Sequence, residues 1–242
     1  MSGVAGRIRT AIVRAGFSAH YRLTDLAYAA DIVTPKRTVA GPYWSSELTN
    51  AHGDDPGLAA LETLPADAVI VDVGSHVGEY AIPLARGTDR RVVAFEPNET
   101  ARTRLERNVA RNAVDEQVAV HRIGIGDRDG AVPFHRSTFS KLSSFDREHA
   151  CRWGARVVAS ERVPIRRLDT LVGEGIPSPD GMKIDVEGAE AAVLRGGAAT
   201  IEAHHPLLVV EIHDECDGEW ITDWLTERDY AIEASDDALI CR

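Results

Sequence analysis

A glycine-containing turn follows the apolar segment 69–73 and has residue types suited to binding a small ligand. Asp72, Gly74 and Gly78 have the spacing D-x-G-x-x-x-G. Glycines at a strand-to-helix turn let a ligand approach the backbone beyond the carboxyl end of the strand. Dinucleotide-binding turns instead have the spacing G-x-G-x-x-G. The turn therefore favours a ligand without phosphate, such as S-adenosylmethionine; a glycine turn with a purely structural role is the alternative.

A second acid, Glu96, directly follows the apolar segment 92–95. It lies about as far beyond Asp72 as the acid that binds ribose hydroxyls in nucleotide-binding folds. We expect the Glu96 carboxylate to bind both hydroxyls of a ribose. In the alternative interpretation, Glu96 only stabilises the N-terminus of the next helix through the helix dipole.

Four ionisable side chains follow two later apolar segments. Asp185 and Glu187 alternate, so they point to the same side, and Glu211 and His213 repeat this spacing. Buried acids are costly unless they are paired, and Lys183 could neutralise one of them. We predict Asp185, Glu187 and His213 as catalytic residues that could accept a proton, and histidine has the ordinary pKa closest to neutrality.

Two other chemistries are compatible with this group of acids. Oxygen-rich side chains suit magnesium or calcium, so a divalent metal held by Asp185, Glu187, Glu211 and His213 is a separate hypothesis, although we assign no metal site. A carboxylate acceptor would need no general base, and arginine could hold it through paired hydrogen bonds. The possible arginines are Arg152, Arg156 and Arg166.

These residues lie at the ends of segments that alternate between strand and helix patterns. Strands are expected over 69–73, 92–95, 118–125, 180–186, 207–212, 230–234 and 238–241, and helices over 78–87, 98–112, 188–203 and 217–228. Right-handed crossovers between parallel strands place helices on both faces of a sheet. We therefore predict an α/β fold with a doubly wound, mostly parallel sheet and a C-terminal antiparallel hairpin.

Two segments interrupt this alternation. Segment 35–66 has four prolines and three glycines, so we expect it to be irregular. A polar insertion lies between expected short strands at 131–135 and 161–165 and could cover the pocket for a substrate. We divide the chain into an N-terminal helical or irregular extension, 1–66, and a main domain, 67–242.

The composition excludes several classes of protein. There are 27 basic and 38 acidic residues and a formal net charge of −11, so a nucleic-acid partner is not expected. Three cysteines without paired spacing and the lack of a long apolar segment favour a cytoplasmic protein. Residues 4–16 have the pattern of a basic amphipathic helix, which could dock on the main domain or contact the inner face of a membrane peripherally.

Several longer motifs together resemble the FkbM family of O-methyltransferases. They are K-I-D-V-E-G-A-E at 183–190, L-R-G-G at 194–197, R-V-P-I-R-R-L-D-T-L at 162–171 and the pair Ser143-Ser144. The resemblance extends from about residue 69 to residue 213. It implies a Rossmann-like class I methyltransferase fold and S-adenosylmethionine as cofactor. It also implies transfer of a methyl group to a hydroxyl or carboxyl oxygen of a small molecule or glycan, such as a sugar, a uronic acid or another secondary metabolite.

The resemblance also suggests which residues surround the cofactor. It places Asp72, Gly74 and Gly78 around the methionine part, Glu96 on the ribose and Asp127 toward the adenine. The neighbouring residues Ser75, His76, Tyr80 and Pro97 complete the predicted cofactor-binding set.

The first motif departs from the family pattern G-A-N-x-G, because here it reads Gly74-Ser75-His76-Val77-Gly78. Two alternative functions remain. An NAD-dependent oxidoreductase is disfavoured by the missing third glycine and the absent substrate domain. The other alternative is a non-catalytic module that binds S-adenosylmethionine.

Overall fold

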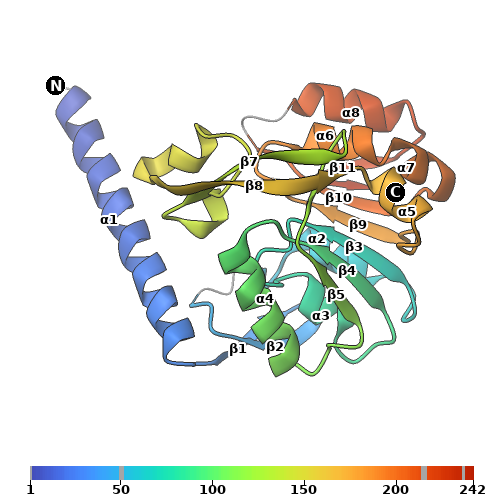
Figure 1. The fold of residues 1–242 in the computed structure, drawn as a ribbon, viewed down its shortest axis with the longest axis horizontal. Coiled ribbons are helices and arrows are strands. Elements are labelled where there is room, and N and C mark those ends of the chain that lie inside the picture. Colours follow the sequence, from blue (N-terminus) through green and yellow to red (C-terminus); the bar gives the residue numbers. More distant parts are fainter. Residues whose placement is uncertain (1, 49–51, 214–216, 236–237) are drawn as a thin grey trace.

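A mixed α/β sheet forms the centre of the protein in the computed structural model (Figure 1). The structure describes residues 2–48, 52–213, 217–235 and 238–242, and it describes side chains from residue 15 onward. The seven strands of the sheet have the order β11-β12-β10-β9-β3-β4-β5. They are β3 (Val69–Val73), β4 (Arg91–Phe95), β5 (Val118–His121), β9 (Gly181–Ile184), β10 (Leu207–Glu211), β11 (Ile232–Ser235) and β12 (Ala238–Cys241).

The pairing of these strands confirms the predicted fold class. Strands β3, β4, β5, β9 and β10 are parallel to one another, whereas β12 runs antiparallel to β10 and to β11. The order reverses between β3 and β9, because the chain starts at β3, builds outward to β5 and then returns to the other side of β3. Ligands bind beyond the carboxyl ends of strands at such a reversal.

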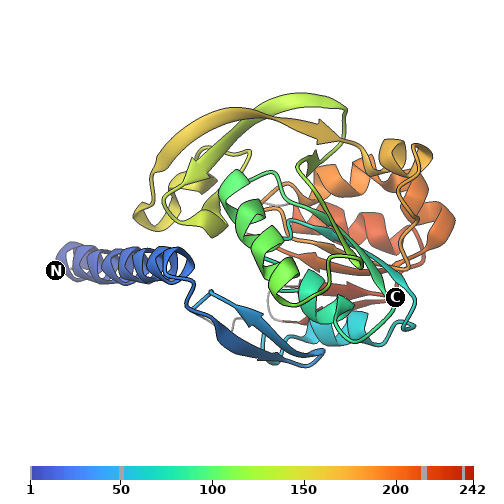
Figure 2. The same ribbon diagram turned by 60° about the horizontal axis from the view of Figure 1, so that its bottom comes forward.

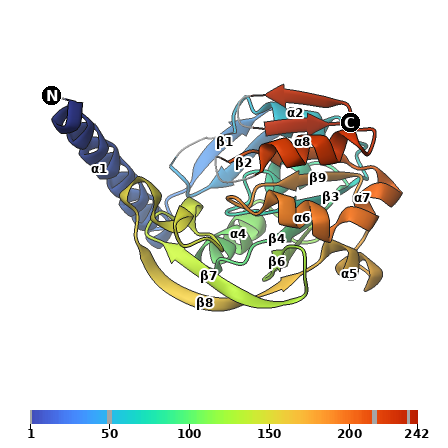
Figure 3. The ribbon, with the colours of Figure 1, turned by 90° about the horizontal axis from the view of Figure 1, so that it is seen from above.

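Alternating apolar residues of the strands face two separate layers of helices (Figure 3). On one face, Ile70 and Val92 pack with α2 (Pro56–Glu62), α3 (Ala81–Ala85) and α4 (Glu99–Arg111). On the other, Val71 and Val93 pack with α5 (Leu168–Gly173), α6 (Glu190–Gly196), α7 (Ala198–His204) and α8 (Gly218–Thr226). The sheet is therefore buried on both sides, as its apolar sequence predicts.

The structure corrects the prediction that 35–66 is irregular. This segment contains most of a hairpin, β1 (Thr34–Thr38) and β2 (Gly41–Ser45), and all of α2. The proline that begins α2 is tolerated because the first turn of a helix has no partner for its backbone N–H. Asp55 caps the same helix by accepting a hydrogen bond from the N–H of Leu58. Because Leu58 and Leu61 belong to the core, the packed domain includes residues before position 67.

Two predicted elements are broken by tertiary contacts. The expected helix over 188–203 is two helices, α6 and α7, separated by Gly197. At the end of α6, a Cβ on Gly196 would lie 1.8 Å from the carbonyl oxygen of Gly126, so another part of the chain passes against the helix there. The expected strand 118–125 ends at His121, and β6 (Gly124–Ile125) pairs with a second sheet instead.

The second sheet forms an arm beside the central sheet (Figure 2). Strands β7 (Gly130–Ser137) and β8 (Val157–Arg166) are longer than the expected strands at 131–135 and 161–165. The connection between them contains two short 3-10 helices, η1 (Ser140–Leu142) and η2 (His149–Gly154). This connection is the polar insertion expected from the sequence, and it lies against the carboxyl ends of the central strands.

The N-terminal helix α1 (Ser2–Ala29) is longer than the expected helix at 4–16 and projects from the body of the protein (Figure 1). Its Phe17 and Tyr21 rings pack on Phe139 and Trp153 of the β7–β8 connection. The side chains of residues 1–14, which would form the expected basic face, lie outside the described part of the chain. Among the described helices, none combines the length and the apolar character needed to cross a membrane.

Candidate active site

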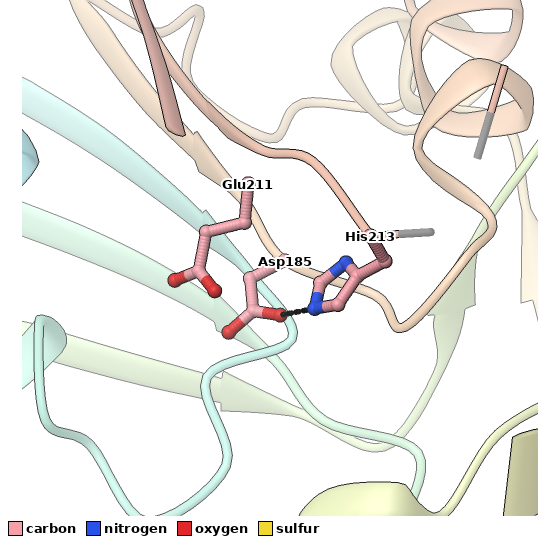
Figure 4. Close-up of side chains that lie close together, drawn as sticks. All are labelled: Asp185, Glu211 and His213. Carbon is pink, nitrogen blue, oxygen red and sulfur yellow. Dashed lines mark ion pairs between the residues drawn. The ribbon is translucent and has the colours of Figure 1, made fainter. Parts of the chain in front are cut away.

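A pocket with about 900 Å³ of empty space, part of it open to solvent, lies at the carboxyl ends of the central strands. We call it the site pocket. The ends of β3, β4, β9 and β10 form its floor, and residues from β6, β7 and η1 form the facing wall. Figure 4 shows Asp185 and Glu211, which line the pocket, and His213, which does not line it but lies beside Asp185.

Gly74 begins the turn after β3 and borders the site pocket. It has a φ of +83°, and a Cβ at this position would lie 1.8 Å from the carbonyl oxygen of Asp185. Only glycine fits, because any side chain would collide with the backbone that leaves β9. The N–H of Gly74 donates to the carbonyl oxygen of Phe95, which ties the turn to the end of β4.

His76 has a φ of +47°, in the left-handed region that asparagine and histidine adopt more readily than most residues. The family pattern has asparagine at this position, so the departure noted in the sequence preserves the backbone conformation. The N–H of His76 donates to Oε2 of Glu96 at 2.8 Å, and its Nε2 lies 2.9 Å from Oγ of Ser140 in η1. His76 therefore connects the turn, the end of β4 and the facing wall.

Glu96 is 6% exposed and borders the site pocket together with Pro97. Its Oε1 accepts a hydrogen bond from the N–H of Asn98 at 2.7 Å, so each carboxylate oxygen receives one backbone N–H. Burial raises the pKa of Glu96 to about 7, and the charge of His76 and the two backbone N–H groups act in the opposite direction. Because a backbone N–H holds each carboxylate oxygen in place and further lone pairs remain, the carboxylate can accept hydrogen bonds from two hydroxyl groups.

Four other residues of the predicted cofactor set lie behind the pocket lining. The Ser75 hydroxyl donates to the carbonyl oxygen of Asp72, and burial raises the pKa of the Asp72 carboxyl. A Cβ on Gly78 would lie 2.7 Å from side chains of α3 and α4, so this glycine serves close packing of the helices. The Tyr80 hydroxyl donates to Oδ1 of Asp55 at 2.6 Å.

Asp127 is exposed and does not border the site pocket. The physical reason is the break after β5, which turns the chain into β6 of the arm. Ile123, Gly124 and Ile125 line the pocket instead, together with Phe134 and Phe145, and the Phe145 ring lies against Gly124. The region predicted for an adenine therefore has an apolar wall, and Asp127 is not part of it.

Lys183 lies between the acids at the ends of β9 and β10. Its Nζ is 2.7 Å from Oδ2 of Asp185 and 3.7 Å from Oε1 of Glu211. Burial would lower the pKa of Lys183, but the charges of Asp185 and Glu211 hold it well above its usual value. Burial and the charge of Asp185 raise the pKa of Glu211 to about 7, although Lys183 acts in the opposite direction. Glu211 therefore changes protonation near neutrality.

His213 is held by three carboxylates. Its Nδ1 is 3.0 Å from Oε1 of the fully buried Glu190, and its Nε2 lies 3.6 Å from Asp185 and 3.5 Å from Glu187. Burial would lower the pKa of His213, but the Glu190 hydrogen bond and the charges of Glu187 and Asp185 raise it to about 9. This histidine is therefore protonated at neutral pH, so the expectation that it is the base best suited to neutrality is not supported.

The turn after β9 is fixed by Glu190, which sequence reasoning did not single out. Its Oε1 accepts hydrogen bonds from the N–H groups of Val186 and Gly188, both at 3.1 Å. Between them, Glu187 has a φ of +55°, and its Oε2 lies 2.6 Å from Nε2 of His149 in η2. The motif D-V-E-G-A-E thus stabilises its own turn, because its last acid, Glu190, accepts hydrogen bonds from the backbone of that turn.

A second group of charges, around Glu79, is also missing from the sequence-based set. The Glu79 carboxylate accepts a hydrogen bond from Nζ of Lys141 at 2.9 Å and lies 3.7 Å from Nε2 of His52. Burial would raise the pKa of Glu79, but Lys141 and the histidines hold it well below its usual value. Burial would lower the pKa of His52, but hydrogen bonds to Asp55 and Glu79 raise it to about 9. His52 and Lys141 are thus cations at the rim of the site pocket.

The positions of these side chains bear on the hypothesis that the acids hold a divalent metal. Ligand atoms of Asp185, Glu211 and His213 lie within 4.8 Å of one another (Figure 4), but Glu187 is not part of that group. The Lys183 ammonium already lies against two of these residues. A divalent ion would therefore meet a buried positive charge at the same place.

Comparison with known proteins gives the family. The family model described as "Methyltransferase FkbM domain" matches residues 72–232. Hexuronic acid methyltransferase AglP of Haloferax volcanii is 31% identical over 177 residues, which cover 72% of this chain and 67% of AglP. AMB antimetabolite synthetase AmbE of Pseudomonas aeruginosa is 32% identical over 216 residues, which cover 73% of this chain but only 10% of that protein.

A solved structure supports the fold. The crystal structure of methyltransferase FkbM from Methylobacillus flagellatus has a TM-score of 0.55 and 21% sequence identity, and the match covers 74% of this chain and 45% of that one. The match of the family model extends over both ends of the site pocket, from the turn after β3 to β11. This chain therefore belongs to the FkbM methyltransferase family and is a methyltransferase rather than an NAD-dependent oxidoreductase.

Proposed function

We propose that this methyltransferase takes its methyl group from S-adenosylmethionine and transfers it to an oxygen atom of a sugar or another secondary metabolite. The observation that carries the proposal is the Glu96 carboxylate, which two backbone N–H groups hold at the rim of the site pocket. Its free lone pairs suit the two hydroxyls of a ribose. S-adenosylmethionine, when bound, supplies an electrophilic methyl group on sulfur.

The residues around Glu96 fit the rest of this cofactor. Gly74 leaves backbone exposed to the pocket at the turn, where an amino acid moiety can approach closely. The apolar wall formed by Ile123, Phe134 and Phe145 suits a flat aromatic base. Because the turn lacks the third glycine of the dinucleotide-binding pattern, it favours S-adenosylmethionine over a dinucleotide.

The opposite end of the site pocket would hold the acceptor. For a hydroxyl acceptor, Glu211 is the side chain best suited to remove the proton, since its pKa of about 7 lets it accept a proton near neutral pH. Lys183 and Asp185 would fix the orientation of Glu211 and of the acceptor hydroxyl. His213, protonated at neutral pH, would act as a hydrogen-bond donor to the acceptor instead of a base.

A carboxyl acceptor is the second possibility, and it is favoured by the cations of the site pocket. His52, Lys141 and Lys183 all border the pocket, and a carboxylate needs no proton removed before it attacks the methyl group. AglP, a relative, is named for methylation of a hexuronic acid. Base-labile methyl esters in the product would identify a carboxyl acceptor, whereas base-stable ethers would identify a hydroxyl acceptor.

Calorimetric titration of the purified protein with S-adenosylmethionine and with NAD tests the cofactor. We expect binding of S-adenosylmethionine alone, weakened about 10- to 100-fold in Glu96→Ala because hydrogen bonds to a charged group are lost. The exposed Glu99→Ala is the matched control and should bind like the wild type. Binding of NAD instead, or of neither compound, would contradict the proposal.

The catalytic assignment needs a separate test, because a module that only binds the cofactor would pass the titration. Asp185→Asn and Glu187→Gln should each bind S-adenosylmethionine and transfer methyl groups at least about tenfold more slowly. Glu211→Gln should abolish the rise of the rate toward pH 7 for a hydroxyl acceptor. Unchanged transfer in all three variants would remove the catalytic assignment and leave the cofactor assignment intact.

A further inference from the structure

A second hollow lies beside the site pocket, and its lining comes from α1, the start of α4 and the β7–β8 arm. Figure 2 shows how these elements lie near one another. We call it the arginine groove. It has about 1400 Å³ of empty space, part of it open to solvent, compared with about 900 Å³ in the site pocket. The two hollows share Asn98 and Ser140 in their linings. The two hollows therefore adjoin, so one molecule can occupy both.

The lining of the groove is strongly basic in a protein whose net charge is −11. It contains four arginines, Arg22, Arg104, Arg136 and Arg156, and a single carboxylate, Asp25. Asp25 forms an ion pair with Arg104, whose guanidinium also lies over the ring of Tyr28. Among the described residues that line the groove, no other carboxylate neutralises the remaining three arginines.

These three arginines are weakly paired within the described residues. The Nε of Arg136 lies 3.9 Å from Oε1 of Glu161, beyond hydrogen-bonding distance, and it is buried without a hydrogen-bond partner there. Arg22 and Arg156 are exposed, and neither forms an ion pair among the described residues. A buried guanidinium donor without a partner carries a cost that a bound anion would remove.

The framework that carries these arginines is well fixed. Arg156 and Thr138 are joined by two hydrogen bonds, from the N–H of Thr138 to the Arg156 carbonyl at 2.8 Å and from the N–H of Arg156 to Oγ1 of Thr138 at 3.0 Å. The rings of Tyr21 and Phe139, stacked 5.0 Å apart, join α1 to the same wall. Arginines on a fixed framework bind planar or tetrahedral anions through paired hydrogen bonds.

We propose that the arginine groove binds an anionic group of the methyl acceptor, a carboxylate or a phosphate, that is distinct from the oxygen receiving the methyl group. Asn98 and Ser140 adjoin the Glu96 end of the site pocket, so the acceptor passes along the facing wall over the cofactor, and its reacting oxygen extends toward the acid cluster. The inference rests on the proposed function. It gives Arg22, Arg136 and Arg156 a role in selecting acidic acceptors over neutral ones.

Binding of simple sugar derivatives to the full-length protein tests this role. Calorimetric titrations with glucose 1-phosphate, glucuronate and glucose compare a phosphate, a carboxylate and a neutral compound on the same ring. We expect the wild type to bind at least one of the two anions and to bind glucose more weakly. The double variant Arg22→Gln, Arg156→Gln should lose about tenfold in affinity for that anion.

The control variant Arg91→Gln, Arg128→Gln changes the net charge equally at exposed sites outside the groove, and it should bind like the wild type. Preference for glucose 1-phosphate identifies a phosphate group, and preference for glucuronate identifies a carboxylate. The inference is overturned if neither anion binds, if glucose binds as well as the anions, or if the groove and control variants lose equal affinity.

Titration with S-adenosylmethionine separates this inference from the proposed function. Neither double variant changes a residue at the cofactor end of the site pocket, so both should bind the cofactor like the wild type. If the wild type does not bind S-adenosylmethionine, the proposed function fails. If the cofactor binds normally but the anions do not distinguish the groove variant from its control, only the arginine groove assignment fails.

Discussion

The two ends of the site pocket are built on different physical principles. At the end formed by β3 and β4, backbone groups set the geometry: Gly74 has no room for a Cβ, and the N–H groups of His76 and Asn98 orient Glu96. At the end formed by β9 and β10, charged side chains set the geometry: Lys183, Asp185 and Glu211 with their neighbours hold one another.

The difference indicates how each end can change. Backbone geometry is insensitive to pH and salt, so the positions of the groups at the first end should change little, even though burial raises the pKa of the Glu96 carboxyl there to about 7. A cluster of interacting charges responds to protonation and to ligands, because each group alters the pKa of the next. A fixed geometry would suit a cofactor that stays the same, and a responsive cluster of charges would suit acceptors that differ between enzymes of one family. The following predictions test this contrast.

Gly74→Ala should have the largest effect. The new Cβ would lie 1.8 Å from a backbone oxygen at a φ of +83°, so the turn or the end of β9 must move. We expect a loss of at least about 4 kcal/mol in the free energy of unfolding, measured with urea.

The control for this variant is Gly87→Ala, which has a φ of +76° and no atoms within 4 Å of the new Cβ. It should lose only about 1 kcal/mol, the cost of the left-handed conformation alone. Equal losses in the two variants would show that the contact between the β3 turn and β9 is not rigid.

Lys183→Met should have the next largest effect, because it leaves Asp185 and Glu211 together without their shared cation. The raised pKa of Lys183 means that its contribution is fully present below its ordinary value of 10.5 and is lost only as the pH rises through the folded-state value. At neutral pH we expect a loss of about 3 kcal/mol in unfolding free energy.

The loss in Lys183→Met should be smaller at pH 5, where Glu211 is protonated. The double variant Lys183→Met, Asp185→Asn should recover much of the stability, since it removes a charge from each side. If the double variant is no more stable than Lys183→Met, packing of the lysine stem and not charge holds this end of the pocket.

The same contrast explains which parts of the molecule the sequence predicts. The apolar strands and the tight turn at Gly74 depend on local patterns, and the structure has them where they are expected. The break after His121 depends on the pairing of β6 with the distant strand β8, and the hairpin β1–β2 pairs two short neighbouring segments that contain Pro35 and Pro42. A count of prolines and glycines does not reveal such pairing.

The sequence predicts those residues of the site that lie at the ends of strands. Asp185 and Glu211 follow apolar strands, so their proximity follows from the parallel sheet. His52, Lys141 and His149 come from polar segments without periodicity. Only the folded chain places His52 and Lys141 at the pocket and His149 against Glu187. The protonation of His213 likewise depends on its contact with the buried Glu190, and sequence patterns do not show that these two side chains meet.

Glu211→Gln should have a smaller effect that depends on pH. In the folded protein the Glu211 pKa is about 7, compared with an ordinary value of 4.5, so the folded state holds its proton longer and stability falls as the pH rises from 4.5 through 7. Glutamine has no such dependence. Above pH 7 the variant should be more stable than the wild type by about 1–2 kcal/mol, and below pH 4.5 the two should agree.

Unfolding in urea across this pH range measures the Glu211→Gln difference, and the exposed Glu116→Gln serves as its control. A stability difference that does not vary with pH would show that the Glu211 carboxyl is not titrating in the folded protein near neutrality.

The smallest expected effect is that of magnesium on the wild type. Asp185, Glu211 and His213 are close enough to share an ion, but Lys183 and the protonated His213 already supply positive charge there. Millimolar magnesium should therefore leave the wild-type melting temperature unchanged, and a chelator should leave methyl transfer unchanged. In Lys183→Met the same acids lack their ammonium partner, so magnesium should stabilise the variant by roughly 1 kcal/mol. Stabilisation of the wild type by magnesium would instead mean that a metal, and not the lysine, organises the β9–β10 end.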